Sequence, residues 1–85
     1  MRYTNNRNIH KATMDISIQQ DQVLLYYKGI IKRIKGRNHR GEVMELPFDI
    51  FLDYVSTDGL HGTFEITYSS DGGSVGKLVH LRKLS

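Results

Sequence analysis

Cysteine and tryptophan are absent from this chain of 85 residues, and proline occurs once, at Pro47. Without cysteine the chain can form no disulfide, no thiolate metal site and no cysteine nucleophile, which fits a reducing cytoplasm. No segment approaches the ~18 consecutive apolar residues of a membrane-spanning helix, and the N-terminus lacks the apolar stretch of a signal peptide. We therefore expect a cytoplasmic protein that makes no membrane contact.

Charge of one sign is missing from each of two neighbouring segments. Residues 28–40 contain six of the 12 basic residues and no acid, whereas residues 42–58 contain five acids and no Lys or Arg. The net charge of +3 therefore conceals one basic and one acidic segment. Such an asymmetry concerns binding partners more than the fold.

The composition is that of a small globular domain. Leu, Ile, Val and Phe make up 24 of the 85 residues, above the level of about 20% below which disorder is expected. A chain of this length forms one domain with a thin core. Residues 1–12 are polar, Asn-rich and aperiodic, so we interpret them as a leader that need not be ordered. We assign residues 13–85 to a single compact domain.

The first half of that domain is predicted to contain a strand and a helix. Apolar residues alternate with polar ones over residues 14–18, which predicts a short strand. Ser17 and Gln20 have the spacing of a capping box, which predicts a helix over about residues 18–28. Gly29 suits the left-handed position that ends a helix.

A hairpin is predicted next. Residues 30–37 indicate a strand, residues 38–41 a polar turn, and residues 42–46 the returning strand. The alternation of side chains places Met44 and Leu46 toward the core.

The second half is predicted to contain a helix followed by another hairpin. Pro47 suits the start of a helix, whose apolar stripe would consist of Phe48, Phe51, Leu52 and Val55. Residues 64–68 predict a strand, residues 70–73 a hairpin turn, and residues 77–84 a closing strand. The inward face of that last strand stays open, because apolar residues occur on both of its sides.

The predicted order of elements is therefore β-α-β-β-α-β-β. Two hairpins and two short helices favour the α+β class, with an antiparallel sheet of about five strands and the helices on one side. No internal repeat is present.

No pattern in the chain indicates an enzyme, a metal or a cofactor. Residues 72–77 resemble a phosphate-binding loop but are one residue too short, and a strand rather than a helix follows them. The four histidines lack a metal-binding spacing. Asp49 and Asp53 lie four residues apart, which is more often a solvated helix face than an acid–base pair. We expect a non-enzymatic protein without metal, cofactor or small-molecule substrate.

The basic segment is the one candidate site. Its cationic residues are Lys28, Lys32, Arg33, Lys35, Arg37 and Arg40. On a strand, alternate side chains lie about 7 Å apart, a spacing close to that of successive phosphates. Tyr26 and Tyr27 lie just upstream and could stack a base. Both fit the apolar stripe of the predicted helix, so we expect at least one of them in the core and select Tyr26 for stacking. Two other interpretations stay open: a solvated face that discourages edge pairing, or a surface that binds an acidic partner.

Four short segments carry a family resemblance through their order and spacing. They are Tyr26-Tyr27-Lys28-Gly29, Leu46-Pro47-Phe48, Asp58–Phe64 and Leu78–Leu84. From Met14 to Leu84 the chain resembles a small, uncharacterised proteobacterial family, catalogued as domain of unknown function 2835. The resemblance implies a compact stand-alone domain and transfers no activity or ligand residue. It also implies arginines near the second helix, where this chain has Asp49 and Asp53.

Two functional hypotheses follow from these observations. The first is a non-enzymatic binding module that contacts nucleic-acid phosphates through the basic strand and turn. The alternative is a protein-interaction or regulatory subunit that binds no nucleic acid. In that case the basic strand would contact an acidic protein, or the acidic helix of a second copy in a homodimer.

Overall fold

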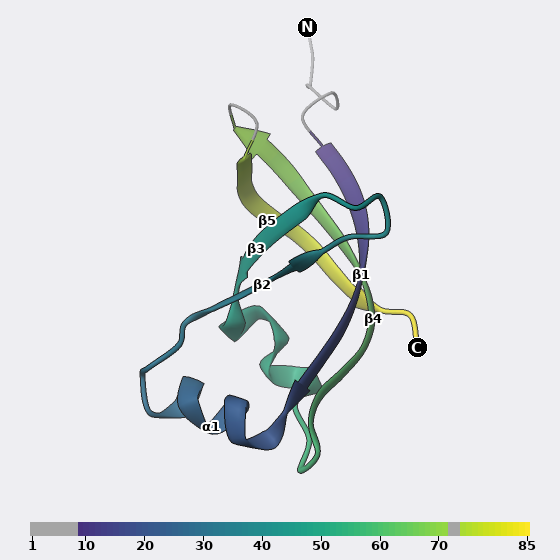
Figure 1. The fold of residues 1–85 in the computed structure, drawn as a ribbon. Helices are drawn as coiled ribbons and strands as arrows, with labels where there is room; N and C mark the ends of the chain where they lie inside the picture. The colour runs from purple at the N-terminus through teal and green to yellow at the C-terminus, as the bar shows by residue number, and fades with distance from the viewer. Residues whose placement is uncertain (1–8, 72–73) are drawn as a thin grey trace, which may run out of the picture.

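The structure is a computed structural model that describes residues 9–71 and 74–85 (Figure 1). Its elements are β1 (Ile9–Gln19), α1 (Gln20–Tyr27), β2 (Arg33–Arg37), β3 (Val43–Pro47), the 3-10 helix η2 (Phe48–Tyr54), β4 (Gly59–Asp71) and β5 (Ser74–Lys83). The predicted α+β class is confirmed. Strands and helices follow one another in the predicted order, but the second helix is a 3-10 helix and not an α-helix. Within the described residues no helix is long enough or apolar enough to cross a bilayer.

The strands form two antiparallel sheets, so the prediction of a single five-stranded sheet is wrong. One sheet has the order β1-β4-β5 and the other is the β2-β3 hairpin. The hairpin crosses in front of the longer sheet (Figure 1) and meets β1 at a single bridge, between Met14 and Asn38. The physical reason is coverage: an apolar sheet face must be covered by a second layer. Two short helices cannot cover strands of 11 and 13 residues.

The core lies between these two layers. On the long sheet, Met14 of β1 pairs with Phe64 of β4, and Ala12 pairs with Ile66. The buried apolar side chains are Ala12, Met14, Ile16, Val23, Ile34, Met44, Leu46, Phe48, Phe51, Leu60, Phe64 and Ile66. The inward orientation predicted for Met44 and Leu46 is confirmed, and the predicted stripe of the second helix buries its two phenylalanines.

The first strand begins earlier than predicted. Residues 9–12, which the sequence analysis assigned to the leader, belong to β1, and Ala12 is buried. Ile9 pairs with Ser69 at the far end of β4. Residues 9–12 are held in the strand by pairing with residues of β4 that lie about 60 positions away in the chain. Their own polar sequence therefore does not predict a strand. Residues 1–8 lie outside the described residues.

The predicted capping box at the start of the first helix is wrong. Ser17 lies inside β1, and its hydroxyl bonds to His61 Nδ1 at 3.0 Å. Helix α1 begins at Gln20 after Gln19, which makes no side-chain capping bond. The strand alternation outcompetes the capping pattern because Ile16 is buried and Ile18 packs against the core.

The predicted end of the first helix is confirmed. Gly29 has a φ of +79°, a conformation that favours glycine. Its N–H donates to the Tyr26 carbonyl at 2.9 Å, and the Ile30 N–H donates to the Leu25 carbonyl at 2.9 Å. These are the two bonds of a Schellman motif.

A β-bulge determines the inward face of the last strand. Thr67 pairs with His80 and Tyr68 with Leu78, so Val79 is an extra residue on β5. The bulge allows both Leu78 and Leu81 to pack against the core, while Val79 is 55% exposed. β5 is an edge strand of its sheet. Of the predicted turn over residues 70–73, Gly72 and Gly73 lie outside the described residues.

Candidate functional site

The outer face of the β2-β3 hairpin is cationic. Ile34 is buried, so the alternation of β2 turns Arg33, Lys35 and Arg37 to the exposed side. Their partners on β3 are Pro47, Glu45 and Val43 respectively. Three cations therefore share this face with one carboxylate, that of Glu45. Because exposed ion pairs are weak, Glu45 neutralises little of the positive charge of this face.

The arginines of the segment are oriented by contacts within the protein. Arg33 Nε lies 3.1 Å from Glu45 Oε1, and Arg37 Nη1 donates to the Gly41 carbonyl at 2.7 Å. Arg40 lies in the turn at the far end of the hairpin, where its Nε is 3.6 Å from Glu42 Oε1. These contacts hold the guanidinium groups at the surface and leave other N–H groups available to a ligand.

The lysines of the segment are exposed. Lys28 is the C-cap of α1, Lys32 precedes β2, and Lys35 lies in the middle of β2. Within residues 9–71 and 74–85 none of the three forms an ion pair. They are therefore the cations most open to an external anion.

A pocket of about 690 Å³ opens at one end of this cationic face. Its volume lies in the range of about 300–1,000 Å³ that is usual for small-ligand sites. It is lined by Tyr26, Tyr27, Gly29, Lys32, Arg33, Pro47, Asp49 and Leu52. The Phe48 N–H donates to the Lys32 carbonyl at 2.9 Å and so ties the start of η2 to the segment before β2.

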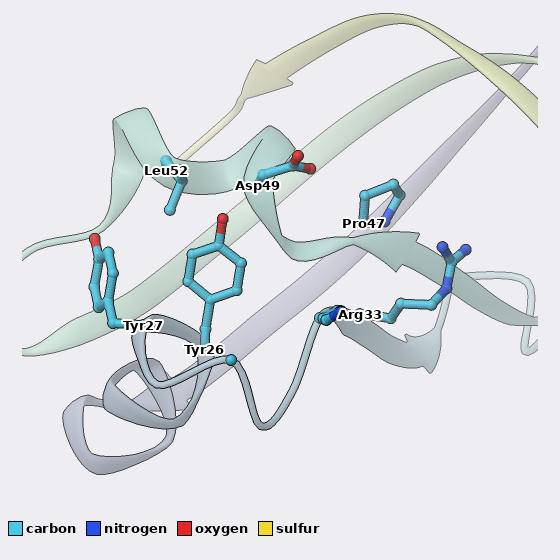
Figure 2. Close-up of a pocket in the computed structure, with 8 residues that line it drawn as sticks. Tyr26, Tyr27, Arg33, Pro47, Asp49 and Leu52 are labelled. Carbon is cyan, nitrogen blue, oxygen red and sulfur yellow. The ribbon is translucent and has the colours of Figure 1, made fainter.

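The two tyrosines of the pocket differ in exposure. The Tyr26 ring stacks on Phe48, with centroids 4.5 Å apart and planes at 12°, so the core covers one of its faces. Tyr27 meets Tyr26 edge to face and is 61% exposed. Figure 2 shows both rings along one side of the pocket, with Asp49 and Pro47 on the other.

The structure brings some of the predicted site residues together. Tyr26, Lys32 and Arg33 line the pocket, and Lys35 and Arg37 continue from it along the hairpin. Arg40 lies apart from the pocket, and its Nη2 donates to the Lys11 carbonyl on β1 at 3.4 Å. The base-stacking role of Tyr26 stays a prediction.

The sequence named Tyr27 beside Tyr26 as a stacking candidate but led us to select Tyr26, and it did not place Asp49 at this site. Helix α1 has only eight residues, too few for the apolar period to decide which tyrosine faces outward. Asp49 is read locally as a solvated helix residue, and its place in the pocket depends on how η2 packs beside α1. The one local signal is Pro47, which is the extended residue just before η2 and not, as predicted, its first residue.

A second polar cluster fastens the hairpin tip to the long sheet. The Asp15 carboxylate accepts a hydrogen bond from Thr63 Oγ1 at 2.6 Å, and its other oxygen lies 3.0 Å from His39 Nε2. These bonds hold the pKa of Asp15 below its ordinary value. The His39 N–H also donates to the Thr13 carbonyl at 2.8 Å. The cluster is therefore a structural connection between the 38–41 turn and β1.

A serine–histidine pair lies beside that cluster. His61 Nε2 is 2.8 Å from the Asp58 carbonyl, which can only accept, so this nitrogen carries the proton. His61 Nδ1 lies 3.0 Å from Ser17 Oγ, and the two contacts fasten the 56–59 turn to β1. In the described part of the chain no group of three His, Asp or Glu side chains is placed to hold a metal ion.

The comparisons with known proteins give a family and no activity. A family model described as "Protein of unknown function (DUF2835)" matches residues 10–84. No curated protein and no solved structure matches the chain.

Proposed function

Because the chain belongs to the DUF2835 family of proteins of unknown function, its function has to be argued from its own residues, and we propose that it binds single-stranded nucleic acid. The outer face of the hairpin would contact the phosphates, and the pocket at its end would receive an unstacked base. Cationic grooves combined with exposed aromatic rings are how sequence-tolerant single-strand binders work.

The exposed row of Arg33, Lys35 and Arg37 carries this proposal. A strand separates alternate side chains by about 7 Å, so the row offers one cation for each phosphate of an extended strand. Lys32 extends the row into the pocket, where Tyr27 exposes its ring. A base that is paired in a duplex could not reach this ring, which is why we favour a single strand over a duplex.

The test is a charge reversal with a matched control. In the variant R33E/K35E/R37E we expect the affinity for a labelled single-stranded oligonucleotide in 50 mM salt to fall at least a hundredfold. The control K11E/K77E/K83E makes the same change in net charge at exposed positions on β1 and β5. The control should lose far less affinity, because its lysines lie outside the hairpin. Circular dichroism would verify that both variants fold.

Equal losses in the two variants would reduce the binding to a net-charge effect and contradict the proposal. Binding of the wild-type protein to a duplex as tightly as to a single strand would contradict the role given to the pocket.

One observation favours a second candidate, a protein-interaction subunit. Leu24, Tyr27 and Ile30 at the end of α1 are exposed by 45%, 61% and 66%, and Lys28 lies among them in the chain. Such apolar side chains beside a cation fit an acidic protein partner or a second copy. Sedimentation over a range of protein concentrations tests the second copy. A concentration-dependent dimer that I30D abolishes would support it, and a monomer at all concentrations would contradict it.

A further inference from the structure

We propose that the pocket between α1 and η2 binds a guanine nucleotide unit, with Asp49 accepting hydrogen bonds from the base and Lys32 and Arg33 contacting its phosphate. The inference rests on the proposed function and adds a base preference to it. It concerns the pocket alone, whereas the phosphate contacts of the proposed function extend along the whole hairpin.

The pocket combines both signs of charge with aromatic rings. Lys32 and Arg33 come from the segment that enters β2, and Asp49 comes from the first turn of η2. Arg33 is held by Glu45 through its Nε at 3.1 Å, and its Nη2 donates to the Glu45 carbonyl at 3.3 Å. In Figure 2 the Asp49 carboxylate lies across from the Tyr26 ring, and the Arg33 guanidinium lies beside Pro47.

Asp49 is the residue that a pocket for phosphate alone would not contain. Its carboxylate is exposed and, in the part of the chain that the structure describes, forms no ion pair with Lys32 or Arg33. A carboxylate repels a phosphate, so a ligand that uses the whole pocket must present hydrogen-bond donors to Asp49 and negative charge to the cations. A nucleotide with donors on its base meets both requirements.

Guanine satisfies a carboxylate better than any other base. Its N1–H and N2–H₂ groups are adjacent donors, so one carboxylate can accept from both at once. Adenine and cytosine offer one amino group beside a ring nitrogen that only accepts. Thymine and uracil offer one N–H between two carbonyl oxygens that repel the carboxylate. We therefore expect the order guanine first, adenine and cytosine next, and thymine or uracil last.

The aromatic side of the pocket supplies a contact that any base can make. Tyr27 exposes its ring, and Tyr26 is held in place by its stack on Phe48. Stacking on an aromatic ring strengthens binding for every base because each has a π-face. Bases differ in how strongly they stack, so the contribution of Asp49 is isolated by comparing guanine with inosine, which have the same ring system.

The experiment compares oligothymidylates of ten residues that carry one central guanine, inosine, adenine, cytosine or thymine. Binding is followed by fluorescence anisotropy, and a single guanine per strand avoids four-stranded assemblies. We expect guanine to bind at least about fivefold more tightly than thymine, the lower end for a bidentate pair. Inosine, which lacks the N2 amino group, should lose most of that gain.

The variant D49N should abolish the guanine preference and raise the affinity for the all-thymine strand, because the carboxylate no longer repels the carbonyl oxygens of thymine. The matched control is D53N, because Asp53 is an exposed residue of the same 3-10 helix and does not line the pocket. It should keep the preference. If 5′-GMP displaces the labelled oligonucleotide at a lower concentration than 5′-UMP does, the pocket also binds free nucleotides. A guanine preference without such competition would restrict the site to bases within a strand.

The failures of the two proposals can be told apart. Salt-dependent binding of all strands with no base preference would overturn the guanine site and leave the proposed function standing. Loss of the preference in D53N as much as in D49N would also overturn it. No binding of any strand at 50 mM salt would overturn both.

Discussion

At Asp15, two side-chain contacts favour the ionised carboxylate. The hydrogen bond from Thr63 is the larger cause and the contact with His39 the smaller, and together they lower the pKa of Asp15 from its ordinary value of 3.8. A lowered folded-state pKa stabilises the fold above the unfolded value, and that stabilisation is lost as the pH falls through the folded-state pKa. Asp15 thus links the position of the hairpin tip to acid stability.

The corresponding prediction concerns the variant D15N. Its free energy of unfolding in urea should depend less on pH below about pH 4 than that of the wild-type protein, because an amide has no proton to gain. At neutral pH the variant should be the less stable of the two. If the free energies of unfolding of the two proteins change with pH in the same way, these contacts do not couple the ionisation of Asp15 to folding.

The two pocket tyrosines allow a second prediction at the residue scale. Y27A should weaken single-strand binding by about 1–3 kcal/mol, the usual value of a stacked base, and hardly change stability because Tyr27 is mostly exposed. Y26A removes the stack on Phe48 and should lower the free energy of unfolding by about 2 kcal/mol or more. Affinity measured on folded protein and urea unfolding separate the two effects. A variant Y27A that loses stability, together with a variant Y26A that loses only affinity, would contradict the pocket geometry.

At the scale of single elements, the connection from η2 to β4 depends on close backbone packing. Gly59 has a φ of +113°, and a Cβ there would lie 2.1 Å from the Ile18 carbonyl oxygen. Gly29 also has a positive φ, yet a Cβ there would meet nothing within 4 Å. G29A should therefore cost about 1–2 kcal/mol from backbone strain alone. G59A should cost clearly more, because β1 and β4 must separate. If thermal or urea unfolding shows that G29A and G59A lower the free energy of unfolding equally, this account is contradicted.

How far each element could be predicted depends on whether its signal is local. The alternation around Phe64 and Ile66, the inward Met44 and Leu46, and the helix stop at Gly29 all follow from nearby residues, and all are confirmed. Ile9 and Val79 differ, because the start of β1 and the bulge in β5 are set by pairing with β4. The capping pattern at Ser17 failed for the same reason.

At the scale of the whole molecule, the separation into two sheets determines where the candidate site lies. The β2-β3 hairpin lies over one face of the long sheet (Figure 1). Its apolar side chains are buried there, so its cationic side chains face outward. The basic residues could be predicted from charge alone, since they are consecutive in the sequence. The pocket could not, because Tyr27 and Asp49 are 22 positions apart and meet through the packing of α1 beside η2.

The most direct test of the central claim is the salt dependence of single-strand binding by the wild-type protein. If the cationic row and its neighbours neutralise about five phosphates, the logarithm of the affinity should fall with a slope of about −3.5 against the logarithm of salt concentration. That slope means a weakening of roughly a hundredfold between 50 and 200 mM salt, and K35Q should reduce its magnitude by about 0.7. Absence of binding at 50 mM salt, or an affinity that salt does not change, would contradict nucleic-acid binding through this hairpin.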